Sequence, residues 1–214
     1  MRPFLVFVST TGASLVPRLF DPAREFDIAI NDYSGVDSGA WAEADFRFSV
    51  QGLKYRILAG TIPTILSWGH AAVALLDDDL DLDAPRINRL FRIGQSLELD
   101  LWQPAHAHDS HNVWPVLWRV EGSFVRRADF VEIMCPFFSR AALRTVAHSF
   151  ALSESGWGLD FLWPQLLKNG RLAIVDSEPM IHTRPSASGD KPNSHGLTAR
   201  QEWERVKEHL LSLP

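Results

Sequence analysis

The feature that most limits how this chain can fold is an apolar run that leads directly into a string of acids. Residues Ala71–Leu76 (AAVALL) are followed without a break by Asp77–Asp83 (DDDLDLD). A continuous apolar run of this length is typical of a strand buried on both faces of a parallel sheet. Ligands of such sheets collect at the carboxyl ends of the strands, which is where the acidic string lies. The sequence therefore predicts an α/β fold with a functional edge.

Other short apolar segments predict further strands. Phe4–Val8 (FLVFV) is a suitable first strand, since polar residues bound it on its carboxyl side. The remaining candidates are Asp27–Ile30, Leu99–Gln103, Phe130–Phe138 and Ala173–Val175. Pro136 would bend the longest of them or confine it to a sheet edge. Strands that alternate with helical patterns favour a layered α/β sheet.

Capping residues and apolar stripes predict the helices. Asp83 can cap one helix and Ser139 another. Their apolar stripes are Ile87, Leu90, Phe91 and Leu97 for the first helix, and Leu143, Val146, Ala147 and Phe150 for the second. The stretch Glu154–Phe161 (ESGWGLDF) predicts a loop that opens a short helix.

The carboxyl-terminal part of the chain predicts one more helix, over about 199–213. Its apolar positions are Trp203, Val206, Leu210 and Leu213. The polar segment before it, about 186–198, is expected to be mobile. With 214 residues, of which 46% are hydrophobic, the chain is long enough for one large core, so we expect a single domain over 1–214.

Composition excludes several classes of protein. Cys135 is the only cysteine, so neither an intramolecular disulfide nor a cysteine-based zinc site can form. The formal net charge is −5 and the basic residues are scattered, which argues against nucleic acid as a partner. No apolar stretch reaches the roughly 18 to 20 residues of a membrane-spanning helix, and Met1–Val8 is too short for a secretory signal. We therefore expect no membrane span and a cytoplasmic location.

The acidic string has the chemistry of a site for a hard divalent cation. Carboxylate oxygens at this density suit Mg²⁺ or Mn²⁺, which would bridge them to substrate phosphates. In an extended conformation Asp77 and Asp79 would point to one side and Asp78 to the other. The alternative is a solvated loop in which Asp83 only caps the helix.

Two other metal-dependent patterns fit the string less well. An EF-hand loop would need Gly where Leu82 stands and Glu where Asn88 stands. A phosphatase of the haloacid dehalogenase type also has an acid pair after a buried strand, but it would need Thr or Val in place of Asp81. Phosphatase chemistry stays a distant alternative.

Four longer segments resemble one protein family. They are Leu75–Leu80 (LLDDDL), Phe130–Arg140 (FVEIMCPFFSR), Gly156–Phe161 (GWGLDF) and Ile174–His182 (IVDSEPMIH). In this order and spacing they resemble the family of unknown function labelled DUF707, which is grouped with GT-A-like glycosyltransferases. The resemblance covers roughly residues 4–185. It implies a Rossmann-like GT-A domain with a mixed, mostly parallel central sheet flanked by helices.

The resemblance also implies roles for individual residues. Asp77 and Asp79 match the Asp-x-Asp element that holds a divalent metal, Mn²⁺ or Mg²⁺, and His182 matches a later metal ligand. Asp78 would lie against the nucleotide-sugar. Asp160 matches the acceptor-side carboxylate that serves as base, although it could equally cap the short helix beside it. Trp157 and Gly158 would lie on the acceptor side.

Further positions are implied for the nucleotide-sugar donor. Ser9, Thr10 and Gly12 follow the first strand, and Asp32 and Tyr33 follow the second. Lys54 could meet phosphate charge, although it and Arg56 also suit a solvated helix. The segment QPAHAHDSHNVW places His106, His108 and His111 close together, but its composition favours a polar loop that lines the acceptor cleft over a zinc site.

Together these features predict a metal-dependent glycosyltransferase. It would move a sugar from a nucleoside-diphosphate-sugar donor to a carbohydrate or other hydroxyl acceptor. If Asp160 is the base, the displacement is direct and the product has inverted anomeric configuration. The alternatives are a non-catalytic protein that binds nucleotide-sugar or carbohydrate on the same scaffold, and a metal-dependent phosphoester hydrolase.

Overall fold

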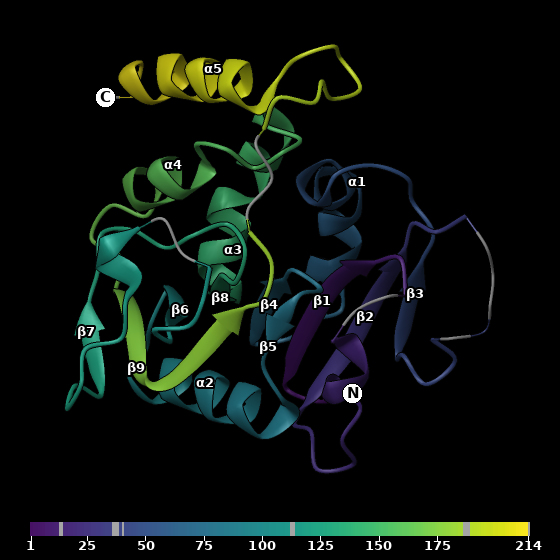
Figure 1. The fold of residues 1–214 in the computed structure, drawn as a ribbon, viewed down its shortest axis with the longest axis vertical. Coiled ribbons are helices and arrows are strands. Elements are labelled where there is room, and N and C mark those ends of the chain that lie inside the picture. Colours follow the sequence, from purple (N-terminus) through teal and green to yellow (C-terminus); the bar gives the residue numbers. More distant parts are fainter. Residues whose placement is uncertain (13–14, 36–38, 40, 112–113, 186–188, 214) are drawn as a thin grey trace.

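In the computed structural model, the chain forms a mixed β-sheet with helices on both faces (Figure 1). The structure describes residues 1–214 apart from 13–14, 36–38, 40, 112–113, 186–188 and 214. Its strands are β1 (Phe4–Thr10), β2 (Phe26–Asp32), β3 (Phe46–Phe48), β4 (Ala72–Leu76), β5 (Leu80–Asp81), β6 (Leu101–His106), β7 (Val125–Arg127), β8 (Phe137–Ser139) and β9 (Leu172–His182). Its α-helices are α1 (Lys54–Ser67), α2 (Ala84–Ser96), α3 (Arg140–Val146), α4 (Leu159–Leu166) and α5 (Ala199–Leu211). Three 3₁₀ helices are described: η1 (Val16–Leu19), η2 (Pro115–Leu117) and η3 (Ala147–Leu152).

The strands pair in the order β3-β2-β1-β4-β8-β6-β9-β5, and β7 also pairs with β9. The half β3-β2-β1-β4 is parallel throughout. The other half is mixed, because β8 runs antiparallel to β4 and β6 whereas β9 runs parallel to β6. Carboxyl ends of β1, β2 and β4 therefore meet at one edge of the molecule. The predicted strands Phe4–Val8, Asp27–Ile30 and Ala71–Leu76 are confirmed as β1, β2 and β4.

Alternation along the central strands separates two hydrophobic cores. In β1, Phe4, Val6 and Val8 face the core that α2 covers, and Leu5 and Phe7 face the core that α1, α3 and α4 cover. Successive side chains of a strand point to opposite faces, so each apolar strand contributes to both cores. The result is a three-layer α/β arrangement. Figure 1 shows α5 beyond α4, on the side away from the sheet, and the two helices are in contact.

Helix starts follow the predicted caps. The Asp83 carboxylate accepts a hydrogen bond from Arg86 N at 3.0 Å, and Ser139 Oγ accepts one from Ala142 N at 3.1 Å. Both satisfy backbone donors that a helix start leaves without a partner. At α5 the side chain of Thr198 accepts from Gln201 N and the Gln201 side chain accepts from Thr198 N, which is a capping box.

Several predicted boundaries differ from those of the structure. The first helix ends at Ser96, so Leu97 lies outside it and is 42% exposed. Of the segment Phe130–Phe138, only its end lies in a strand, β8. Before it, Met134 O and Pro136 O accept from Asp77 N and Leu75 N, so the segment follows β4 without regular pairing. Pro136, with no N–H, cannot donate to a ladder.

β9 is much longer than the predicted strand Ala173–Val175. Its first part pairs with β6 and β7, and its last residues pair with β5. Asp176, expected at a strand end, is fully buried within β9, where Arg126 Nε lies 3.1 Å from its Oδ2. The polar residues after Val175 broke the apolar pattern, but that part of the strand carries polar contacts instead of core.

The polar segment before α5 is tied down at several described positions. Asn193 Nδ2 donates to Glu202, and Ser194 Oγ donates to Glu154. Residues 186–188 of the predicted mobile segment 186–198 lie outside the described residues. The helix predicted over about 199–213 is α5, which ends at Leu211, so Leu213 lies beyond it. No helix in the described part of the chain is long and apolar enough to cross a membrane.

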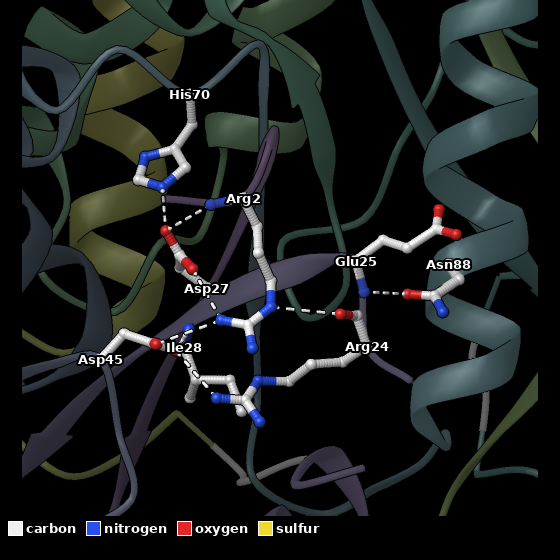
Figure 2. A network of polar contacts seen from close by, with 8 residues as sticks. All are labelled: Arg2, Arg24, Glu25, Asp27, Ile28, Asp45, His70 and Asn88. Carbon is white, nitrogen blue, oxygen red and sulfur yellow. Dashed lines mark hydrogen bonds and ion pairs between the residues drawn. The ribbon is translucent and has the colours of Figure 1, made fainter. Parts of the chain in front are cut away.

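A polar network holds the opposite edge of the sheet, at the amino ends of β2 and β4 (Figure 2). Asp27, at the start of β2, accepts from Arg2 N and Nη1 and lies 3.0 Å from His70 Nε2. Asp45 accepts from Arg2, Arg24 and Ile28 N. Burial alone would raise the pKa of Asp27, but the hydrogen bonds from His70 and Arg2 outweigh it, so the pKa is lowered.

Candidate active site at the carboxyl ends of the parallel strands

The acidic string begins where β4 ends, and its three consecutive carboxylates have different partners. β1 and β4 are paired up to Val8 and Leu76, so the residues after them lie side by side. Thr10 Oγ1 donates to Asp78 Oδ2 at 2.8 Å across that junction. Lys54, at the start of α1, donates to Asp77 Oδ1 at 2.5 Å. Tertiary partners, more than strand alternation, therefore set the direction of each carboxylate.

His182 is brought to Asp79 by the pairing of β5 with β9. Leu80 and His182 are register partners in that antiparallel ladder. His182 Nε2 lies 3.3 Å from Asp79 Oδ2. The backbone is fixed as well, because Thr183 N and Oγ1 both donate to Asp79 O. His182 is thus a buried residue at a strand end, not a surface loop histidine.

The two side chains shift each other's protonation. Burial alone would raise the pKa of Asp79, but the hydrogen bond and charge of His182 and the charge of Arg184 lower it below its usual value. Burial alone would lower the pKa of His182, but Asp79 raises it. Each group therefore favours the charged form of the other.

Lys54 is used differently from the role that its sequence position suggested. Besides Asp77, its ammonium donates to Ile133 O at 2.7 Å and contacts Met134 O at 3.4 Å. An ammonium has three donors, so these contacts use all of them. Burial raises the pKa of Asp77, and Lys54 opposes that rise. Lys54 therefore points into the protein and holds the first carboxylate of the string.

Arg184 is a residue of this site that the sequence did not single out. Its Nη2 lies 3.9 Å from Asp78 Oδ1 and its Nε lies 3.8 Å from Asp79 Oδ2. It comes two residues after His182, at the end of the segment that resembles the family. Its closeness to His182 in sequence was the only available signal, because arginines outside strands are common on protein surfaces.

The residues expected near the nucleotide divide into two groups. Thr10 and Tyr33 lie at the acidic string: burial and then the charge of Asp78 raise the pKa of Tyr33. Gly12 is exposed and its N–H donates to Thr10 Oγ1 at 3.1 Å. By contrast, Ser9 Oγ accepts from Asn31 Nδ2, and Asp32 Oδ1 accepts from Ser34 N. Ser9 and Asp32 thus support the strand ends and the turn after β2.

Asp160 is buried in the first turn of α4. The residue is only 6% exposed, and Asp160 Oδ1 accepts a hydrogen bond from Phe161 N at 3.1 Å. Burial, and then the nearby charge of Glu132, raise the pKa of Asp160 to about 7. The buried Tyr55, whose hydroxyl donates to Ile133 O at 2.6 Å, has a pKa raised first by burial and then by the charges of Asp77 and Asp160.

The loop before Asp160 is shaped by two glycines. Gly156 (φ 87°) and Gly158 (φ 91°) have left-handed backbones that favour glycine. A Cβ on Gly158 would lie 2.5 Å from the Trp203 ring, so α5 packs directly on this loop. Trp157 is partly exposed, and its ring lies over Gly189. Gly158 therefore has a packing reason beside its expected acceptor-side role.

The histidine-rich segment is not a polar loop throughout. His106 lies in β6 and is fully buried, with Nδ1 2.8 Å from Ser110 Oγ and Nε2 3.2 Å from Glu132 Oε2. Ser110 Oγ in turn accepts from His182 N at 2.8 Å. The first part of β6 was predicted as the strand Leu99–Gln103, but Pro104 and the histidines hid its end, because they break the apolar pattern. Residues 112–113 of the segment lie outside the described residues.

Asp79 and His182 are the pair best placed to hold a divalent cation. Asp79 Oδ1 is a buried oxygen without a hydrogen-bond partner, and His182 Nε2 faces the other oxygen. Across the described part of the chain, no group of three or more His, Cys, Asp or Glu side chains could hold a metal ion. This donor pair fits a cation that takes its other ligands from substrate phosphate and water, as Mg²⁺ usually does. Asp77 is occupied by Lys54.

Solved structures with the same arrangement of strands and helices are glycosyltransferases of the GT-A type. The crystal structure of S. aureus TarS 1-349 in complex with UDP-GlcNAc matches 98% of the chain with a TM-score of 0.62 at 12% identity. That of S. aureus TarS matches 98% with a TM-score of 0.63 at 11% identity. The chain spans 65% of the first structure and 39% of the second. The GT-A-like α/β fold is thereby confirmed.

A family match agrees with the fold. Residues 126–211 match the family described as "Protein of unknown function (DUF707)", so the resemblance is confirmed over that segment. It includes Phe130–Arg140, Gly156–Phe161 and Ile174–His182, whereas Leu75–Leu80 lies before it. No curated protein matches the chain.

Proposed function

We propose that this chain is a metal-dependent glycosyltransferase that moves a sugar from a nucleoside-diphosphate-sugar to a hydroxyl acceptor. The observation that carries the proposal is the meeting of Asp79, in the turn before β5, with His182, at the end of β9, on a GT-A-like fold. TarS, which has the same fold, was solved with UDP-GlcNAc. A nucleoside diphosphate donor at the carboxyl ends of β1, β2 and β4 is consistent with where such sheets bind ligands.

A divalent cation on Asp79 and His182 would neutralise the charge that develops on the leaving diphosphate. Thr10 orients Asp78, and Lys54 holds Asp77, so the carboxylates keep fixed positions while substrate binds. Such preorganisation avoids the cost of turning groups during the reaction. The burial of the surrounding residues strengthens each charge interaction.

Asp160 is the group best suited to take the proton of the acceptor hydroxyl. Its raised pKa of about 7 matches the requirement for a general base near neutral pH. As the acceptor oxygen forms a bond to the anomeric carbon, the bond from that carbon to the diphosphate breaks and the hydroxyl proton passes to the Asp160 carboxylate. One direct displacement inverts the anomeric configuration.

The test is ligand binding followed by turnover. A thermal-shift panel of nucleoside diphosphates is measured with Mn²⁺ and with chelator, since ligands of the native state raise its stability. Stabilisation only with Mn²⁺ supports the proposal, and equal shifts in both conditions contradict the metal bridge. The matching nucleotide-sugar is then incubated with candidate hydroxyl acceptors. Release of nucleoside monophosphate and sugar phosphate without acceptor would indicate phosphoester hydrolysis, and binding without any turnover would indicate a non-catalytic protein.

A further inference from the structure

We propose that Arg184 binds the diphosphate of the donor, and that in the ligand-free protein its guanidinium neutralises the carboxylates that the metal and substrate will use. This inference rests on the proposed function and assigns a substrate contact that sequence reasoning had given to Lys54. Arg184 would therefore act in both states of the site, first on Asp78 and Asp79 and then on phosphate.

The first step excludes Lys54. Its side chain is 12% exposed, and its donors are used by Asp77, Ile133 O and Met134 O. Turning it toward phosphate would break its ion pair with Asp77 and its hydrogen bond to Ile133 O, and both contacts hold a lysine whose side chain is mostly buried. A diphosphate at this site therefore needs another cation.

Arg184 meets that need. Its side chain is 55% exposed, and it lies 3.9 Å from Asp78 and 3.8 Å from Asp79. At these separations the exposed guanidinium makes ion pairs with the two carboxylates without a close hydrogen bond to either of them. The backbone beside it is fixed, because Thr183 N and Oγ1 donate to Asp79 O. A short reach of the side chain alone would move the guanidinium from carboxylate to phosphate.

Chemistry and position agree. A guanidinium binds phosphate oxygens through two parallel N–H donors, which an ammonium cannot do. Arg184 also lies near Tyr33, since its charge opposes the rise that burial and Asp78 cause in the pKa of that residue. Its ion pairs with Asp78 and Asp79 place it at the acidic string, where the donor diphosphate is expected.

Because Arg184 competes with cations for Asp78 and Asp79 but attracts phosphate, its removal has effects of opposite sign. Without the guanidinium, the electrostatic potential at Asp78 and Asp79 is more negative, so binding of Mn²⁺ alone becomes tighter. Binding of a metal-diphosphate becomes weaker, because a charge-assisted contact is lost. A residue with a merely structural role would weaken both or neither.

The experiment uses calorimetric titration of the full chain with Mn²⁺ alone and with preformed Mn²⁺–pyrophosphate, a diphosphate without base or sugar. For Arg184→Ala we expect Mn²⁺–pyrophosphate affinity to fall about 10- to 100-fold, the value of a charge-assisted hydrogen bond. Affinity for Mn²⁺ alone should rise. Arg184→Lys should restore part of the diphosphate affinity, since it keeps the charge without the planar fork.

Two controls separate a specific contact from a general loss of positive charge. Arg18→Ala removes another exposed arginine of the same edge, one paired with Asp81, and Arg89→Ala removes a distant one paired with Glu178. Neither should change Mn²⁺–pyrophosphate affinity more than about twofold, because exposed pairs contribute little. An Arg18→Ala loss equal to that of Arg184→Ala would overturn the assignment.

The outcomes also separate this inference from the proposed function. If the parental protein binds Mn²⁺–pyrophosphate and Arg184→Ala binds it equally well, Arg184 is not the diphosphate contact while the proposed function stands. If the parental protein binds neither probe nor any nucleoside diphosphate, the proposed function itself fails. Circular dichroism and thermal melting confirm that each variant is folded.

Discussion

At the scale of single residues, the carboxylates of this site differ because their surroundings differ. Asp77 is held by a lysine, Asp78 by a threonine, and Asp79 by a histidine with one oxygen left over. Asp160 instead has a pKa that burial raises to about 7. Ionised carboxylates suit cation binding, and a carboxyl that titrates near neutrality suits proton transfer.

Asp79→Asn is expected to weaken metal-dependent nucleoside diphosphate binding by about 10- to 100-fold, the loss typical of one charge-assisted contact. The variant removes the negative charge of Asp79, which both His182 and the cation would contact, while an amide of the same size keeps the packing. The measurement is nucleotide titration with Mn²⁺ and with chelator, and Asp81→Asn is the matched control. Unchanged affinity in Asp79→Asn would move the metal site elsewhere in the acidic string.

Asp160→Asn is expected to lower the transfer rate by about 10²- to 10⁴-fold and leave donor affinity unchanged, because the amide cannot accept a proton. It should also stabilise the protein at alkaline pH. The pKa of Asp160 is about 7 in the folded state and near 3.8 in the unfolded state. The stability that its protonated form contributes is therefore fully present below the unfolded pKa and is lost as the pH rises through the folded pKa. Above that pH the buried charge costs on the order of 4 kcal/mol.

Urea unfolding at pH 5 and pH 8 measures the effect on stability. The parental protein should lose stability between these values, and Asp160→Asn should lose less. If the stability of both proteins depended on pH in the same way, and Asp160→Asn transferred sugar at the parental rate, Asp160 would only be a residue of the helix start.

At the scale of elements, α5 determines how the Asp160 loop is held. Glu202 is 2% exposed, and its carboxylate accepts from Glu154 N at 2.7 Å, Ser155 N at 3.1 Å and Asn193 Nδ2 at 2.6 Å. A single buried side chain thus joins α5, the segment before α5 and the loop that leads into α4. No sequence pattern indicated the burial of Glu202, because a glutamate in a charged helix normally faces solvent.

Glu202→Gln is expected to lower stability by about 1–3 kcal/mol, because the new amide group turns a donor toward backbone donors. Hydrogen exchange should become faster over residues 153–161, while donor affinity stays unchanged. Glu204→Gln, an exposed substitution on the same helix, is the control and should be neutral. Equal exchange in both variants would show that α5 does not anchor the loop.

The elements that the sequence predicted well are those with an uninterrupted pattern. β1 and β4 contain continuous apolar runs, and α2 and α3 start at side-chain caps. Prediction was poor where strands carry polar side chains for tertiary reasons, as with His106 in β6 and Asp176 in β9. Contacts between distant segments, such as Ser110 with His182, have no signature in a local pattern.

At the scale of the whole molecule, the sheet has a structural edge and a candidate functional edge. The network of Figure 2 holds the amino ends of the strands, and the acidic string lies at the carboxyl ends. Asp27 contributes at the first edge with a pKa below its usual value. Its stabilising effect is therefore present above the unfolded pKa of about 3.9 and is lost as pH falls through the folded value.

Asp27→Asn should therefore cost stability at pH 7, by about 1–3 kcal/mol for a buried group that loses charged partners. The same variant should lose less additional stability than the parental protein between pH 5 and pH 3. Denaturant unfolding across that range is the measurement, with the exposed Glu208→Gln as control. Identical acid profiles for the parental protein and Asp27→Asn would assign acid sensitivity to other carboxylates.

The place of β9 in the sequence has a consequence for how the protein is made. The parallel half-sheet β3-β2-β1-β4 with α1 and α2 lies within residues 4–96, whereas His182 and Arg184 follow β1–β8. At about 5–20 residues per second, a ribosome reaches His182 roughly 5 to 20 seconds after Asp79. Until then the nascent chain carries Asp78 and Asp79 without these two neighbours. The residues that form ion pairs with Asp78 and Asp79 are thus synthesised late in translation.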